Sequence, residues 1–184
     1  MESNSNQLAI NNGLYIGGIS TILGILVYYV SPDLMGATSF GIIMMLLSLA
    51  LYIFFTIDLR KKVGGFWSFR EALKGIFLMS FIAGLVSIVI NFVFYKFIEP
   101  GAYDKISEIV TQNLSATYEK LGMDQATIDK TIPQVLEKMK AQFDPSFTDV
   151  LKNLGIAVLI QFVMSLIFAA IFKKEQPIFT STEE

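Results

Sequence analysis

Four long stretches without a charged residue constrain this sequence more than any other feature. A helix needs about 20 mostly apolar residues to cross the roughly 30 Å hydrocarbon core of a bilayer. A helix buried in a soluble domain is usually shorter and keeps a polar stripe. The sequence therefore predicts an all-α polytopic membrane protein with four transmembrane helices. The four stretches are Leu14–Val30 within a longer uncharged segment, Leu34–Ile57, Gly75–Tyr95 and Asn153–Phe172.

The composition excludes several classes of function. Hydrophobic residues make up 53% of the chain and charged residues 16%, against about 25% charged residues in soluble domains. The net charge of -2 offers no global basic surface for nucleic acid. The chain has no Cys and no His, and so lacks the usual thiol nucleophile, imidazole base and zinc or haem ligands. We predict a protein that is not an enzyme, with no catalytic residue, cofactor or metal site.

The distribution of Lys and Arg predicts the orientation in the membrane, because positive residues beside membrane helices stay on the cytoplasmic side. The turn at 31–39 has none, whereas the loop at 58–74 has five, and Lys173 and Lys174 follow the last apolar stretch. Both termini and the basic loop are predicted to be cytoplasmic. The five residues are candidate contacts for lipid headgroups or a partner: Arg60, Lys61, Lys62, Arg70 and Lys74.

These features divide the chain into three parts. Residues 1–98 hold the first three membrane helices, residues 99–150 form an extracytoplasmic amphipathic helical loop, and residues 151–184 hold the fourth helix and a short tail. Within the loop, an apolar stripe ends at Gly122, Asp124 caps a short turn, and a second amphipathic helix follows Pro133. Ser68 and Glu71 fit the capping box that starts a helix.

Small and amide side chains mark the faces on which the membrane helices pack. Gly13, Gly17, Thr21 and Gly24 form one stripe, and small residues let helices approach closely. The two amides Asn91 and Gln161 each continue a small-residue stripe on the third and fourth helices. They are predicted either to join the helices or to line a polar groove for a lipid-linked ligand. None of the four stretches contains the ionisable residue that is typical of a proton pathway.

Several short motifs together resemble a bacterial integral membrane family known as domain of unknown function 4199. They are Asn12-Gly13-Leu14, the basic turn with Gly64-Gly65, Glu71-Ala72, Ile98-Glu99-Pro100, Leu121-Gly122-Met123 and Phe172-Lys173-Lys174. The resemblance spans nearly the whole chain. It implies a four-helix protein of the bacterial cytoplasmic (inner) membrane with a helical loop between the last two helices, and it supplies no activity and no site residues.

Two functional hypotheses follow from the sequence. The first is a non-enzymatic accessory or scaffold subunit of the bacterial cell envelope, which engages membrane lipids and an envelope protein, with homo-oligomers as a further option. The second is a carrier or flippase for an anionic lipid-linked intermediate such as a polyprenol-phosphate sugar. In the second, the five basic residues would collect the phosphate, and Asn91 or Gln161 would line the path.

Overall fold

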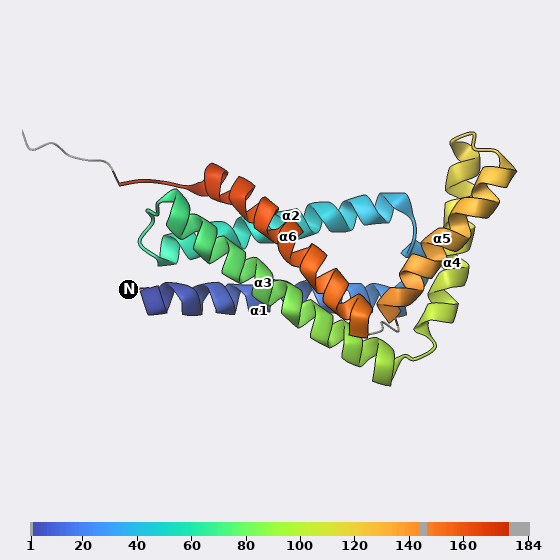
Figure 1. Ribbon diagram of the computed structural model, residues 1–184, viewed down its shortest axis with the longest axis horizontal. Coiled ribbons are helices and arrows are strands. Elements are labelled where there is room, and N and C mark those ends of the chain that lie inside the picture. Colours follow the sequence, from blue (N-terminus) through green and yellow to red (C-terminus); the bar gives the residue numbers. More distant parts are fainter. Residues whose placement is uncertain (1, 144–146, 177–184) are drawn as a thin grey trace, which may run out of the picture.

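The computed structural model describes residues 2–143 and 147–176 of the 184-residue chain. Four of its helices are long and apolar enough to cross a membrane, which confirms the predicted all-α membrane fold. Two further helices between α3 and α6 form a hairpin at one end of the bundle (Figure 1). The elements are α1 (Glu2–Val30), η1 (Pro32–Leu34), α2 (Thr38–Lys62), α3 (Phe69–Val93), η2 (Phe94–Ile98), α4 (Ala102–Lys120), α5 (Gln125–Phe143) and α6 (Phe147–Phe172).

Helix α3 is the central element, with α1 packed along it and α6 crossing it. The close approach of α1 depends on glycine. A Cβ atom at Gly13 would lie 2.5 Å from the Met79 carbonyl oxygen, and one at Gly17 would lie 2.6 Å from that of Ala83. One turn further, the Thr21 hydroxyl lies 3.2 Å from the Ser87 hydroxyl. The predicted small-residue face is therefore the α1–α3 interface.

The prediction was wrong for the last member of that stripe. Nothing in the described part of the chain lies within 4 Å of a Cβ atom placed at Gly24, so this glycine does not serve a close helix contact. The start of α3 follows the sequence closely. Ser68 accepts a hydrogen bond from the backbone N–H of Glu71 at 3.4 Å, and the Glu71 carboxylate accepts one from the backbone N–H of Ser68 at 2.7 Å. This reciprocal pair confirms the predicted capping box.

The α4–α5 hairpin differs from the prediction at Pro133. We expected the second amphipathic helix to begin after this proline, but α5 runs without a break from Gln125 to Phe143 with Pro133 inside it. A proline costs the helix one backbone hydrogen bond. The loss is outweighed here because Ile128 and Ile132, on one side of Pro133, are buried, and Leu136 and Met139, on the other, pack into the cluster at the hairpin base. Gly122 turns the chain between the two helices with φ +76°.

The hairpin is attached to the bundle by polar and aromatic contacts. At the end of α3 the chain widens into a single π-helical turn, η2, which brings Glu99 beside the end of α1. The Tyr28 and Tyr29 hydroxyls donate to the two oxygens of the Glu99 carboxylate at 3.1 and 2.7 Å. The rings of Tyr95 and Phe143 lie with their centroids 4.4 Å apart, which joins α5 to η2.

A second attachment joins α4 to the turn between α1 and α2. The Asn113 side-chain amide donates to the carbonyl oxygens of Asp33 and Met35, both at 3.0 Å. Gly36 has φ +85°, and a Cβ atom there would lie 2.8 Å from the Val110 side chain. Only glycine adopts this backbone at low cost, and only glycine leaves room for Val110.

Gly36→Ala should therefore weaken the attachment of the hairpin. We expect the free energy of unfolding to fall by about 1–3 kcal/mol, because the left-handed backbone and the contact with Val110 both oppose a side chain. The matched control is Gly41→Ala, which lies on α2 with nothing within 4 Å of the added atom. Unfolding curves in a defined detergent measure both, and equal stability of the two variants would contradict the prediction.

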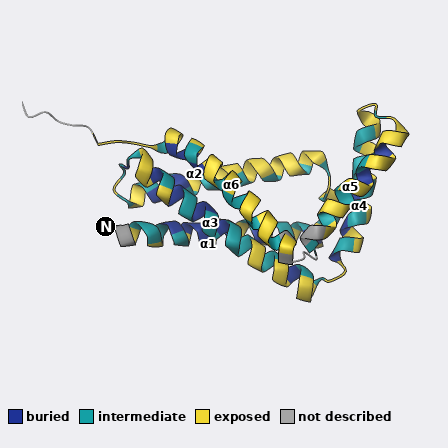
Figure 2. Ribbon diagram, viewed as in Figure 1, coloured by how far each residue is buried: buried dark blue, intermediate teal, exposed yellow. Residues whose placement is uncertain are grey.

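Helix α2 has few protein neighbours. Figure 2 shows its exposed surface along most of its length, and only Thr56 and Leu59 are buried. Its contacts with α1 are concentrated in the half that ends at the basic loop, since both buried residues lie there. The half next to η1 exposes large apolar side chains, namely Ile42, Ile43, Met45, Leu46, Leu47 and Leu49. In a membrane this half of α2 faces lipid.

Candidate functional site at the basic end

The structure gives the five predicted basic residues different surroundings. Arg60 is half-buried and its guanidinium donates to the carbonyl oxygen of Phe172, the last residue of α6, at 3.3 Å. Lys61 and Arg70 are exposed. Lys62 and Lys74 both line one cavity at the end of the bundle that carries the loop between α2 and α3, which we call the basic end. The structure therefore brings two of the five side chains together and places Arg60 at the end of α6.

The end of α6 is held by the loop between α2 and α3. The Trp67 indole N–H donates to the Phe172 carbonyl oxygen at 2.8 Å. The backbones of Trp67 and Lys174 exchange two hydrogen bonds, at 2.8 and 3.0 Å. Because the last carbonyl groups of a helix have no partner within the helix, these donors satisfy one of them. Trp67 itself is buried and holds the end of α6 in place.

A comparison of Arg60 with its exposed neighbour Lys61 tests whether Arg60 holds the end of α6. Arg60→Gln should cost about 1 kcal/mol of stability through the lost hydrogen bond to Phe172, and should speed amide exchange in the last turn of α6. Lys61→Gln, at the exposed neighbouring position, should change neither. Hydrogen exchange read by mass spectrometry measures both variants, and equal protection in the two would mean that Arg60 does not hold α6.

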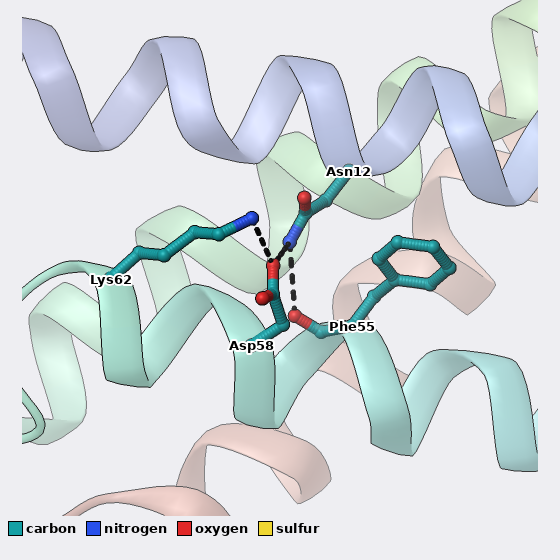
Figure 3. Close-up of polar contacts among 4 residues, drawn as sticks. All are labelled: Asn12, Phe55, Asp58 and Lys62. Atoms are coloured by element: carbon teal, nitrogen blue, oxygen red, sulfur yellow. Dashed lines mark hydrogen bonds and ion pairs between the residues drawn. The ribbon is translucent and has the colours of Figure 1, made fainter.

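Lys62 belongs to a polar cluster that joins α1 to α2 (Figure 3). Its ammonium lies 2.8 Å from a carboxylate oxygen of Asp58, one turn earlier on α2. The same oxygen accepts a hydrogen bond from the Asn12 side-chain amide at 3.0 Å, and that amide also donates to the Phe55 carbonyl oxygen at 3.1 Å. Asn12 is only 1% exposed. The cluster is the main polar contact between these two helices in the described part of the chain.

The cavity beside this cluster has a volume of about 420 Å³. Its walls combine ammonium groups, amides and aromatic rings. The one carboxylate in the wall, that of Glu71, already accepts hydrogen bonds from Ser68. A cavity of this composition suits a polar, anionic group such as a phosphate, which lysine binds as a point charge. The lining residues are Asn4, Ser5, Asn6, Leu8, Lys62, Val63, Gly64, Phe66, Trp67, Glu71, Lys74 and Gly75.

The two intramembrane amides do not meet. Gln161 of α6 packs against α3 at Gly84, where an added Cβ atom would lie 2.6 Å from its side-chain nitrogen. Asn91 lies seven residues further along α3, about 10 Å by the rise of a helix. Gln161 therefore acts at a close crossing of α3 and α6, and the two amides do not line a common groove.

Sequence reasoning missed Asn12 and Asp58 as members of the site. Asn12 entered only through the family resemblance. A signal existed in the spacing, since an acidic residue four positions before a lysine on a helix places the two side chains on one face. The contact of Asp58 with Asn12 could not be predicted from sequence spacing, because it depends on how α1 and α2 pack. Within residues 2–143 and 147–176, no three carboxylates come close enough to hold a metal ion.

Comparison with known proteins gives a family for this chain. The sequence pattern of the family described as "Protein of unknown function (DUF4199)" matches residues 11–174. The chain belongs to the DUF4199 family. This confirms the resemblance seen in the sequence motifs. The matched region of the DUF4199 family includes Asn12, Asp58, the basic loop and the α4–α5 hairpin. No curated protein and no solved structure matches the chain.

Proposed function

We propose that this DUF4199 protein is a non-enzymatic accessory subunit of the bacterial cytoplasmic membrane that presents the α4–α5 hairpin to a protein partner in the envelope. The observation that carries the proposal is the fixed attachment of a polar hairpin to an apolar four-helix bundle (Figure 1). The positive-inside rule places the hairpin outside the cytoplasm and the basic loop and both termini inside.

The fixed attachment supports a role in binding. A segment held in its bound orientation loses less conformational freedom when a partner docks, and so more of the contact energy becomes affinity. The hairpin has two independent attachments, Glu99 with the α1 tyrosines and Asn113 with the α1–α2 turn. A simple connecting loop between two membrane helices would not need either.

The tip of the hairpin offers a candidate contact point. Leu121 is 71% exposed and follows the exposed charged residues Glu119 and Lys120. Large apolar residues of the two helices are buried instead, among them Ile106 and Val110 of α4 and Ile128 of α5. An exposed apolar side chain among charged ones matches the pattern of an interface anchor with a polar rim.

Replacement of Leu121 tests this proposal. The tagged protein is purified from membranes of its own host, and the proteins that accompany it are quantified by mass spectrometry. Leu121→Asp should lower the yield of a stoichiometric partner about tenfold, which corresponds to about 1.4 kcal/mol of binding. The matched control, Gln134→Asp, is exposed on α5 away from the tip and should retain it. Partner yields that are the same in both variants, or the absence of any stoichiometric partner, would refute the proposal.

A second candidate is favoured by the cavity at the basic end. The pairing of Lys62 and Lys74 in one cavity supports a carrier for an anionic lipid-linked intermediate such as a polyprenol-phosphate sugar. Here Lys74→Gln should weaken the binding of polyprenyl phosphate to the purified protein, and Lys61→Gln, outside the cavity, should not. Equal affinities for the two variants would exclude this cavity as the phosphate site.

A further inference from the structure

A second cavity lies at the opposite end of the bundle, between α2 and the base of the hairpin. Its volume is about 630 Å³, within the range of roughly 300–1,000 Å³ that is typical of small-molecule sites. Among the residues that the structure describes, no charged one lines it. We call it the hairpin groove, and its walls are Met35, Gly36, Ala37, Thr38, Phe40, Gly41, Ile42, Met45, Tyr95, Ile106, Val110, Met139 and Phe143.

The walls of the hairpin groove are held in place by one contact outside the groove and two between its lining residues. Asn113 fixes α4 to the turn before α2 through its two hydrogen bonds. Gly36 and Val110 are in contact where these two walls meet. The tilted contact of the Tyr95 ring with the Phe143 ring fixes the third wall, formed by η2 and α5. The groove is therefore formed before any ligand arrives.

The groove is continuous with the part of α2 that faces lipid. Ile42 and Met45 line the groove, and they are also 51% and 62% exposed. Their neighbours Ile43 and Leu46 continue the same apolar surface along α2. A hydrocarbon chain that lies against α2 in the bilayer can thus extend into the groove without crossing a polar barrier.

We propose that the hairpin groove binds an acyl chain of a lipid from the leaflet on the hairpin side. The apolar lining suits a hydrocarbon chain and offers no charged partner to a headgroup. Burial of a chain here removes the apolar hairpin walls of the groove, Val110 and Met139 among them, from contact with water, at about 25 cal/mol per Å². The bound chain joins the base of the hairpin to the membrane, independently of any protein partner.

Photocrosslinking with a lipid probe tests the proposal. The full-length protein is placed in lipid discs that contain a phosphatidylglycerol with a diazirine in its acyl chain, and the adducts are mapped by mass spectrometry. We expect adducts on Val110 and Met139 of the hairpin. Adducts on Leu159 and Ile160, which are exposed on α6, serve as the reference for bulk lipid.

Two neighbouring positions on α2 provide the decisive comparison. Met45→Trp fills the mouth of the groove, because an indole ring is far larger than the methionine side chain, and should lower the hairpin adducts about tenfold relative to the α6 reference, a loss of about 1.4 kcal/mol in binding. Leu47→Trp, exposed on the same helix but outside the groove and on another face than Met45, should leave them unchanged. If Met45→Trp does not fold as the natural protein does, Ile42→Trp, at the next lining position, replaces it.

Three results would overturn the proposal. Adducts confined to α2 and α6 would show that no chain enters the groove. Hairpin adducts that persist at full yield in Met45→Trp would show that the chain lies elsewhere on the hairpin. A dimer in native mass spectrometry, together with the absence of hairpin adducts, would assign the groove to a second copy of the chain.

Discussion

Gly17→Ala should lower the free energy of unfolding by about 2 kcal/mol, the middle of the range for an overpacked contact. The added methyl would lie 2.6 Å from the Ala83 carbonyl oxygen and 2.8 Å from the Val86 Cβ atom. Backbone and Cβ atoms cannot turn aside as the end of a flexible side chain can. The α1–α3 pair must therefore separate, although alanine by itself favours a helix by about 1 kcal/mol over glycine.

The adjacent residue is a matched control for this prediction. Gly18→Ala makes the same chemical change on the same helix, but nothing lies within 4 Å of the new atom. It should be neutral or stabilising by up to about 1 kcal/mol through helix propensity. Equilibrium unfolding in mixed detergent micelles measures the two variants side by side. Equal stabilities would show that α1 and α3 are not in close contact in the folded protein.

Asn12→Asp should destabilise the contact between α1 and α2 by about 3 kcal/mol, comparable to the breaking of a buried ion pair. The new carboxylate replaces an amide that lies 3.0 Å from an oxygen of Asp58. Like charges at hydrogen-bond distance repel strongly in a partly desolvated site. The bond from the Asn12 amide to the Phe55 carbonyl oxygen is lost as well. We expect α2 to separate from α1 at the basic end.

The reversed pair tests whether the effect belongs to this contact. The double variant Asn12→Asp/Asp58→Asn restores one amide and one carboxylate, and should recover most of the lost stability. Fluorescence energy transfer between labels on the ends of α1 and α2 measures the separation of the two helices, and unfolding curves measure the stability of each variant. If the double variant were as unstable as Asn12→Asp alone, the geometry in Figure 3 would not describe the contact.

Much of the fold could be predicted from the sequence because its determinants are local. Length and apolarity fix the four spans, and the capping box fixes the start of α3 through residues three positions apart. The glycine stripe also predicted a close-packing face of α1 correctly at Gly13 and Gly17, without naming α3 as the partner. It failed at Gly24 because a small residue permits a close approach but does not show where along α1 the partner helix lies, which depends on how the two helices cross.

The site was harder to predict because it depends on contacts between distant segments. Arg60 and Lys61 are adjacent basic residues, and nothing in the sequence distinguishes their roles. Only the end of α6, more than a hundred positions later, makes Arg60 a helix cap. Asn12 and Asp58 are likewise joined by packing and not by spacing. Pro133 was read as a boundary from its local cost, whereas burial of the α5 stripe against α4 outweighs that cost.

The sparse packing of α2 has a consequence for how the protein responds to its bilayer. Asn12 and Asp58 hold this helix at one end, and Gly36 and Val110 hold the turn at its other end, while its middle faces lipid. Its uncharged part, residues 38–57, spans about 30 Å, which matches the roughly 30 Å hydrocarbon thickness of an average membrane and exceeds that of a thinner one. A helix that is too long accommodates by tilting, and α2 has few protein neighbours to oppose a tilt. Changes in bilayer thickness should therefore act first on the angle of α2, and through its attached turn on the hairpin.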